Sequence, residues 1–297
     1  MKRNSAAFAI LVGLPLALAG LGLLALPACQ GETDGAAETK GEALVELWRL
    51  DCGAFHVGTL NVFSDTQAYP GRKMELTDSC YLIRHGDETM LWDTGLPVEA
   101  LGEELDRSSD DMEGTLSVTL AAQLAEIGLT SDQVGRVGIS HYHFDHVGQL
   151  PVFSGSALLI GKGDWEVVTG DDPPEFLVPA FAPWTSGGGN VEPVEGDYDV
   201  FGDGSVVMLS TPGHTPGHYS LLVRLADMGP VLLTGDLAHF RENYETNGVP
   251  PFNSDREDTI ASLERFKQLA ADNRATVIIQ HEPGDIDKLP AFPTSAR

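Results

Sequence analysis

The sequence predicts an α+β protein in which two stacked, mixed β-sheets are flanked by helices. Short apolar runs typical of strands outnumber the segments with helical spacing, and the helical segments lie between them along the chain. The 33 glycines and 18 prolines indicate many turns and argue against a helical bundle. Hydrophobic residues make up 42% of the 297-residue chain, which is enough for a substantial core.

Nine strands and two helices are expected. Short runs rich in apolar residues predict the strands, in chain order, at residues 44–50, 80–84, 89–92, 136–140, 157–160, 205–209, 219–224, 231–234 and 275–280. Helical spacing over 115–127 predicts one helix. A capping box at 254–257, followed by Ile260, Leu263, Phe266 and Leu269 on one face, predicts the other.

Two stretches, 53–77 and 170–199, lack periodicity and are predicted to be long loops. Loops of this length in a compact domain usually have a function. From about residue 44 the chain contains no internal repeat and no second linker. We therefore expect one domain over residues 44–297.

The N-terminus has the pattern of a secretory signal peptide. Lys2 and Arg3 precede an uncharged apolar run over 6–26, which ends in small residues. The sequence LPAC at 26–29 resembles the bacterial lipoprotein signal, in which the cysteine is lipidated and becomes the first residue. Residues 1–28 are therefore predicted to be a lipoprotein signal peptide, with Cys29 as the lipidated residue.

A tether and a lipid anchor follow from this pattern. Residues 29–43 are polar, contain Gly, Ala and Glu, and are predicted to be flexible. We expect the protein to be exported and anchored to a membrane by the lipid, in the periplasm or at the outer membrane. Plain secretion and an uncleaved anchor are the alternatives. Once Cys29 is lipidated, Cys52 and Cys80 are expected either to form a disulfide or to be buried thiols.

The charge balance excludes some partners. The chain has 18 Lys and Arg against 44 Asp and Glu, a formal net charge of -26. Such an acidic protein repels phosphate backbones and anionic membrane surfaces. Nucleic acid is therefore not an expected partner.

Three histidines and one aspartate fall within the six residues HYHFDH at 141–146, directly after a predicted strand. Alternation along an extended turn places His141 and His143 on the same side, where two imidazoles can hold one metal ion. Asp145 and His146 lie on the following bend and can face a second metal close by. Imidazole and carboxylate ligands suit Zn²⁺ or a similar divalent ion.

Further candidate ligands lie at the ends of other predicted strands. In TPGHTPGH at 211–218, Pro and Gly on both sides fix a rigid turn that holds His214 in place. Asp236 follows the strand predicted at 231–234, where a carboxylate can bridge two cations, and His281 follows the last strand. An active site at one edge of a pair of sheets requires such an arrangement.

These motifs resemble those of the metallo-β-lactamase superfamily, whose members have an αββα sandwich and a dinuclear metal site. The resemblance rests on SHYHFDH at 140–146, followed in order by His214, Asp236 and His281, and spans about residues 44–285. Together with TPGHTPGH, CYLIR at 80–84 and LWDTG at 91–95, it is most similar to the N-acyl homoserine lactonases, which hydrolyse quorum-sensing signals.

The resemblance implies roles for individual residues. One metal ion would be bound by His141, His143 and His214, the other by Asp145, His146 and His281, with Asp236 as the bridge. Asp93, in the DTG turn, would orient the site without binding metal. His218 is expected to support the ligands or the core and not to bind metal.

The function implied is a dinuclear metal-dependent hydrolase that opens the ring of N-acyl homoserine lactones or related lactones by attack of a metal-bound hydroxide. Asp145 or Asp236 is expected to move the proton. His239 stands where these lactonases commonly have a tyrosine, and is expected to stabilise the departing alkoxide. Because an imidazole has a pKa near neutrality, His239 allows activity to depend on pH in a new way.

The acyl tail of such a substrate requires an apolar groove. Aromatic residues of the two long loops and of the HYHFDH motif are the candidates, although core packing is an alternative for each of them. We expect substrate contacts from Phe144, Phe63, Tyr69 and Trp184, with Phe176 and Phe181 as further candidates.

Other functions of the same fold are less well supported. Class B β-lactamases lack an aspartate that bridges the metals, and a glyoxalase-II-like thioesterase would serve a cytoplasmic pool. A nuclease would require a basic face. A surface lipoprotein that binds metal without turnover is the non-enzymatic alternative, and the complete ligand set argues against it.

Overall fold

The computed structural model describes residues 43–297. The predicted signal peptide, Cys29 and nearly all of the predicted tether lie outside the described residues. Over residues 43–297 the structure contains no helix that is both long and apolar enough to cross a membrane.

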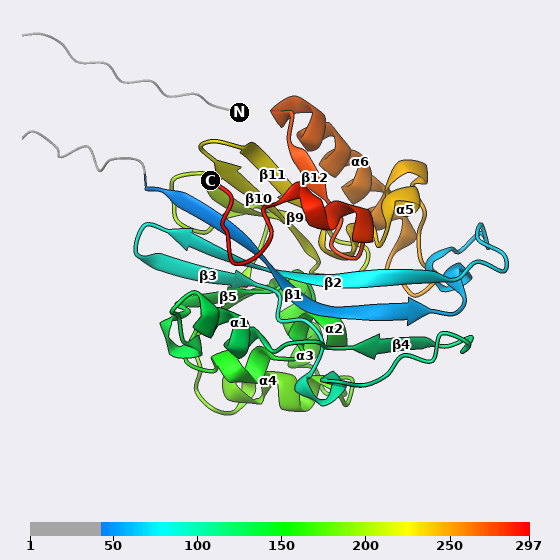
Figure 1. The fold of residues 1–297 in the computed structure, drawn as a ribbon, viewed down its shortest axis with the longest axis horizontal. Coiled ribbons are helices and arrows are strands. Elements are labelled where there is room, and N and C mark those ends of the chain that lie inside the picture. Colours follow the sequence, from blue (N-terminus) through cyan, green and yellow to red (C-terminus); the bar gives the residue numbers. More distant parts are fainter. Residues whose placement is uncertain (1–42) are drawn as a thin grey trace, which may run out of the picture. The chain divides into compact units, whose positions relative to one another are not determined.

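Seven strands form the first sheet, in the order β4-β1-β2-β3-β5-β6-β7 (Figure 1). Strands β4, β1, β2 and β3 pair antiparallel, whereas β3, β5, β6 and β7 pair parallel, so the sheet is mixed. The bounds, in spatial order, are Met112–Thr115, Val45–Val57, Met74–His85, Glu88–Trp92, Arg136–Gly138, Ala157–Gly161 and Val191–Val194.

Five strands form the second sheet, in the order β12-β11-β10-β9-β8. Only β11 and β12 pair parallel within it. The bounds, in spatial order, are Thr276–Ile278, Gly229–Leu233, Tyr219–Leu225, Val206–Ser210 and Tyr198–Asp199.

Side-chain alternation along the strands builds the layers. In β10, Leu221 and Val223 enter a core between the sheets together with Ile83 of β2, whereas Leu222 points the other way. Leu222 packs instead against Phe266 of α6 (Arg256–Asn273). The outer face of the seven-stranded sheet is covered by helices α1, α3 and α4 (Leu120–Glu126, Lys162–Val168 and Leu177–Thr185). The predicted αββα sandwich is confirmed.

Some boundaries differ from the predictions. Strands β1 and β2 extend far into the stretch 53–77, because residues 53–57 pair with residues 74–78 beyond a register shift between Asp51 and Gly53. The predicted helix 115–127 begins only at Leu120, where the Thr119 side chain accepts a hydrogen bond from Ala122 N–H, and Thr115 belongs to β4. Helix α6 is capped by Asp255, one residue later than the start of the predicted box.

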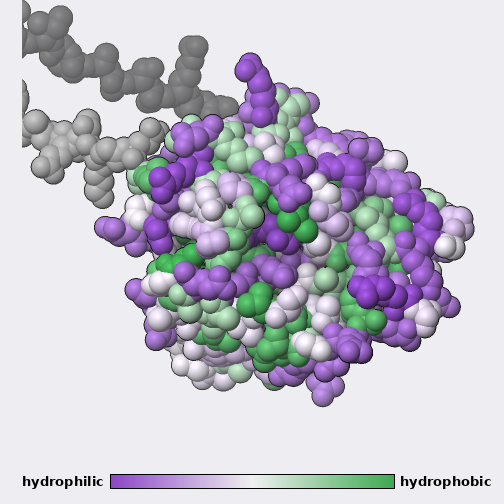
Figure 2. Space-filling model, in the orientation of Figure 1, coloured by the Kyte–Doolittle hydropathy of each residue, from purple (hydrophilic) through white to green (hydrophobic). Residues whose placement is uncertain are grey.

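The prediction of a loop over 170–199 is wrong in part, since it contains α4, β7 and β8. Two short helices complete the fold: α2 (Phe144–Val147) and α5 (Arg241–Thr246). Cys52 and Cys80 form a disulfide between β1 and β2, with Cα atoms 5.7 Å apart. On the face shown in Figure 2, hydrophilic residues are spread widely and hydrophobic residues form separate patches.

Candidate metal centre

The seven predicted ligands lie together at one end of the two sheets. His141 follows β5 after two residues, His214 follows β9, Asp236 follows β11 and His281 follows β12. These four side chains are almost completely buried. Their ligand atoms form two groups, His141, His143, His214 and Asp236 in one and Asp145, His146 and His281 in the other.

In the first group, three imidazole nitrogens converge. Nε2 of His141 lies 2.9 Å from Nδ1 of His143 and 3.2 Å from Nε2 of His214. Nδ1 of His143 lies 2.9 Å from Nε2 of His214. The imidazole nitrogens of His141, His143 and His214 therefore face one point.

The second group has the same character. Nε2 of His146 and Nε2 of His281 are 3.3 Å apart. Each lies 3.9 Å from a carboxylate oxygen of Asp145. This group combines two imidazoles with one carboxylate.

The carboxylate of Asp236 stands between the two groups. Its Oδ2 lies 3.4 Å from Nε2 of His214 and 3.6 Å from Nε2 of His141. Its Oδ1 lies 2.9 Å from Nε2 of His281 and 3.2 Å from Nε2 of His146. One oxygen therefore faces each group, which is the geometry of a bridging ligand.

In His214 and His281, the ring nitrogen that points away from the centre donates a hydrogen bond. Nδ1 of His214 donates to Oδ1 of Asn253 over 2.9 Å, and Nδ1 of His281 donates to the Thr77 carbonyl over 2.8 Å. A hydrogen on Nδ1 leaves the lone pair on Nε2, directed into the centre. When the imidazoles are neutral, lone pairs that converge in this way repel one another unless a cation lies between them, so the donor set fits divalent metal ions.

Asp93 holds His146 in place from outside the centre. Its Oδ2 accepts hydrogen bonds from Nδ1 of His146 over 3.0 Å and from Nε2 of Gln280 over 2.7 Å. Its Oδ1 accepts from the Ser140 N–H over 2.6 Å. Asp93 has a φ of 60°, a left-handed conformation that points its carboxylate back under the motif. It thus links the DTG turn, the HYHFDH motif and the last strand.

His218 is not in either group of ligands. Its Nε2 accepts a hydrogen bond from the backbone N–H of Asp236 over 3.0 Å, and its Nδ1 donates to the Thr211 carbonyl over 3.0 Å. Burial lowers the pKa of His218 to about 4, so the imidazole is neutral and can accept. His218 holds the backbone of Asp236 in place.

The two groups differ in electrostatics. Burial holds the pKa of His141 and of His214 well below the ordinary value, so both are neutral and ready to bind a cation. Burial also opposes a charge on His281, but the Asp236 carboxylate outweighs it and raises the pKa of His281 to about 9. Metal binding to the second group therefore displaces protons.

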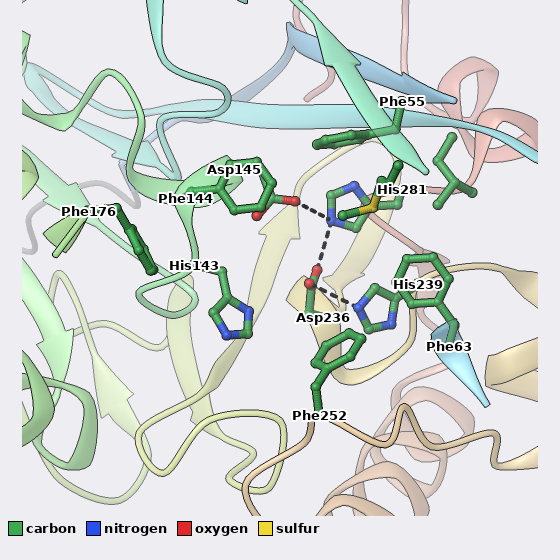
Figure 3. A pocket seen from close by; sticks show the side chains of 12 residues that line it. Phe55, Phe63, His143, Phe144, Asp145, Phe176, Asp236, His239, Phe252 and His281 are labelled. Atoms are coloured by element: carbon green, nitrogen blue, oxygen red, sulfur yellow. Dashed lines mark ion pairs between the residues drawn. The ribbon is translucent and has the colours of Figure 1, made fainter. Parts of the chain in front are cut away.

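A pocket of about 340 Å³ opens onto the centre (Figure 3). Its polar floor is made by His143, Asp145, Asp236, His239 and His281. Its walls are apolar and mostly aromatic: Phe55, Phe63, Leu76, Met112, Phe144, Phe176 and Phe252. A substrate here would meet the centre at one end and apolar surface around it.

His239 lies against the Asp236 carboxylate. Its Nε2 is 3.2 Å from Oδ2 of Asp236, and its ring packs on Phe63 with centroids 4.4 Å apart. The side chain lines the pocket beside His281. It is thus placed to contact a molecule bound over the centre.

Not all of the predicted substrate contacts lie in the pocket. Phe63 and Phe144 line it, as does Phe176. Tyr69 does not, because its ring is buried against Phe240 and its hydroxyl accepts a hydrogen bond from Asn243. These positions correct the expectation for Tyr69.

Trp184 also lies away from the pocket. It belongs to α4, which packs it into the core under the seven-stranded sheet, and its Nε1 donates to the Ser156 carbonyl. Phe181 lies in the same core. Sequence reasoning missed Phe55, Leu76, Met112 and Phe252, which come from four distant segments without a common local pattern.

Comparisons with known proteins agree with this geometry. The family model described as "Metallo-beta-lactamase superfamily" matches residues 75–281. An N-acyl homoserine lactonase of Bacillus sp is 31% identical over 219 residues, which are 72% of this chain and 84% of that protein. The N-acyl homoserine lactonase AttM of Rhizobium radiobacter is 32% identical over 189 residues, 57% of this chain and 67% of that protein. The solved structure of a quorum-quenching N-acyl homoserine lactone hydrolase has a TM-score of 0.71 and 25% identity, over 86% of this chain and 99% of that chain.

Proposed function

Because the chain belongs to the metallo-β-lactamase superfamily, we propose that it hydrolyses the lactone ring of N-acyl homoserine lactones at a centre of two divalent metal ions. The position of Asp236, with one oxygen toward each group of ligands, supports a centre of two ions. The relatives named N-acyl homoserine lactonase support the substrate class.

Zn²⁺ is the ion we propose. The ligands are five imidazoles and two carboxylates, a set that suits Zn²⁺ better than the all-oxygen sites of Mg²⁺ or Ca²⁺. Bound there, such ions supply Lewis acidity and make hydroxide available from water at neutral pH.

The protein's own residues position the reaction. The pocket holds the lactone over the floor formed by Asp145, Asp236 and His239. Asp145, which is partly exposed to the pocket, accepts a proton from the attacking water and moves it toward the leaving oxygen of the lactone. His239, beside Asp236, donates a hydrogen bond to the alkoxide that forms when the ring opens.

A direct assay tests this function. The protein loaded with zinc is incubated with N-hexanoyl homoserine lactone, and acid release is followed, with His143→Ala as the blank. We expect a kcat/KM above about 10⁴ M⁻¹s⁻¹, within the ordinary range of enzymes. Binding of two metal ions without ring opening of this lactone or of the N-dodecanoyl lactone would exclude this function and leave other esters, thioesters or β-lactams as substrates to test.

We also propose that the protein is exported and lipidated at Cys29. The support is the LPAC sequence at 26–29 behind an apolar run with two N-terminal basic residues. Expression in a bacterium fed with labelled palmitate should label the wild-type protein and not Cys29→Ala. Equal labelling of both proteins would refute lipidation at this residue.

A further inference from the structure

Asp78 is a buried acid that none of the functions considered above uses. It lies in β2, and its side chain is inaccessible to solvent. Over residues 43–297, neither of its carboxyl oxygens has a hydrogen-bond partner. Burial of a carboxylate without hydrogen bonds or an opposite charge is strongly unfavourable, so an acid at this position requires a physical reason.

The strand places Asp78 between the pocket and the disulfide. Because side chains alternate along a strand, Asp78 lies on the same face of β2 as Leu76 and Cys80. Leu76 lines the pocket over the metal centre, and Cys80 forms the disulfide with Cys52. The residue opposite Asp78 on β1 is Gly53, so β1 contributes no side chain beside the carboxyl group at this point. Asp78 is thus one step below the pocket wall.

The residue before Asp78 is joined to a metal ligand. The Thr77 carbonyl accepts a hydrogen bond from Nδ1 of His281 over 2.8 Å, and the Thr77 N–H donates to the His281 carbonyl over 3.1 Å. Burial raises the pKa of Asp78 well above its ordinary value, and the charges that lower this pKa most are those of His281 and His146. Both histidines belong to the second group of ligands, as does Asp145, whose charge raises the pKa of Asp78. Asp78 therefore lies in the electrostatic field of the second group.

The ligands alone would leave the centre with excess positive charge. Two divalent ions would face only two ligand carboxylates, those of Asp145 and Asp236. Asp93 adds a third carboxylate close by, but three hydrogen bonds occupy its oxygens. The oxygens of Asp78 have no such partners within the described part of the chain. A cation in the second group supplies the opposite charge that this carboxylate requires.

We propose that Asp78 strengthens the binding of a divalent cation by Asp145, His146 and His281 without being a ligand itself. The inference rests on the centre of two metal ions in the proposed function. Asp78 is not among the residues whose ligand atoms converge, so it acts through the field of its charge. A buried charge is screened far less than a charge at the surface. The first group of ligands should gain little from Asp78, because the charges that affect this carboxyl most lie in or beside the second group.

Two variants that each damage one group of ligands allow this selectivity to be measured. His214→Ala removes a ligand from the first group, and His281→Ala removes one from the second. Zinc affinity of the full chain is measured in both backgrounds by competition with a chromophoric chelator, with and without Asp78→Asn. We expect Asp78→Asn to weaken zinc binding at least about tenfold in the His214→Ala background and less than about twofold in the His281→Ala background.

The stability of the metal-free protein separates this role from a structural one. Asp78→Asn and Asp78→Val remove a buried carboxyl group without partners, so the metal-free variants should unfold at a denaturant concentration no lower than that of the wild type. Asp78→Val also repeats the zinc measurement with an apolar side chain of similar size, which suits a buried position. Glu75→Gln is the matched control, because Glu75 lies on the same strand but its side chain is 46% exposed. This control should leave zinc affinity unchanged in both backgrounds.

Metal binding is measured without any substrate, so this proposal and the proposed function can fail separately. If zinc affinity falls only in the His214→Ala background but no lactone is hydrolysed, the lactonase function fails and the role of Asp78 stands. Unchanged zinc affinity in that background overturns the proposal. So does an equal loss of affinity in both backgrounds, or a loss of stability of the metal-free Asp78→Val protein, because the carboxyl group then supports the fold.

Discussion

The backbone N–H of Asp236 donates a hydrogen bond to Nε2 of His218 over 3.0 Å. A neutral imidazole, itself no ligand, therefore fixes the backbone of the residue whose two oxygens face the two groups of metal ligands. Outer contacts of this kind orient metal ligands and affect metal affinity.

Replacement of His218 should weaken metal binding without unfolding the protein. In His218→Ala the Asp236 N–H loses its acceptor, and we expect zinc affinity to fall about 10- to 100-fold. Competition with a chromophoric chelator measures the affinity, and circular dichroism verifies the fold. His85→Ala is the control, since His85 pairs with Asp203 outside the metal centre. Unchanged affinity in a folded His218→Ala protein would show that this hydrogen bond has no part in metal binding.

His239 should affect turnover and not metal content. His239→Phe keeps the packing on Phe63 but removes the hydrogen-bond donor beside Asp236. We expect kcat to fall about 100-fold, as for loss of one donor to a developing oxyanion. Metal content, measured by atomic emission, should stay at the wild-type level. A loss of metal in this variant would mean that His239 is a ligand.

Asp164 should make stability depend on pH. This buried carboxyl accepts hydrogen bonds from Gly217 N–H and the Thr215 hydroxyl, and so holds the turn that carries His214. Burial raises the pKa of Asp164 from 3.8 to about 7. The folded state therefore binds a proton at Asp164 more tightly than the unfolded state does. As the pH rises from about 4 to about 7, the contribution of Asp164 to the free energy of unfolding decreases.

The variant Asp164→Asn tests the predicted direction of this pH dependence. Relative to the variant, the wild-type protein should lose up to about 4 kcal/mol of unfolding free energy between pH 4 and pH 7. Thermal unfolding at several pH values measures the difference. The surface variant Asp171→Asn should show no such trend. A constant difference between the wild type and Asp164→Asn would place the titration of Asp164 outside this range.

The disulfide should stabilise the edge of the site. Cys52 and Cys80 are separated by 28 residues, and a cross-link over such a loop stabilises a protein by about 3–4 kcal/mol. Gly95, the glycine of the DTG turn, packs so closely on the disulfide that a Cβ atom at this position would lie 2.5 Å from Cβ of Cys52. The double variant Cys52→Ala, Cys80→Ala should unfold at a lower denaturant concentration. Equal denaturation midpoints for the variant and the wild type would show that the disulfide does not stabilise the folded protein.

The candidate ligand set could be predicted because local motifs carry most of it and resemble those of the metallo-β-lactamase superfamily. HYHFDH and TPGHTPGH each place several polar residues after a strand, and the predicted strand ends meet at one edge of the sheets. The layers could be predicted because short apolar strands outnumber the helices that lie between them, a pattern typical of stacked sheets covered by helices.

The apolar walls could not be predicted in this way. Tyr69 and Trp184 are aromatic residues of apparent loops, but a bend after the 3₁₀ helix Leu60–Phe63 and the helix α4 place their rings in the core. Phe55 and Phe252 reach the pocket from segments almost 200 residues apart, and only the tertiary fold brings them together. Whether an aromatic side chain faces a core or a cavity is determined by such contacts and leaves no pattern in the chain.

The most direct test of the metal centre is a titration of the metal-free protein with zinc, in which bound metal and hydrolysis of N-dodecanoyl homoserine lactone are measured on the same samples. The geometry around Asp236 predicts that activity rises until two equivalents are bound and then stays constant. Full activity at one equivalent, or two bound equivalents without hydrolysis of any lactone, would contradict a dinuclear lactonase.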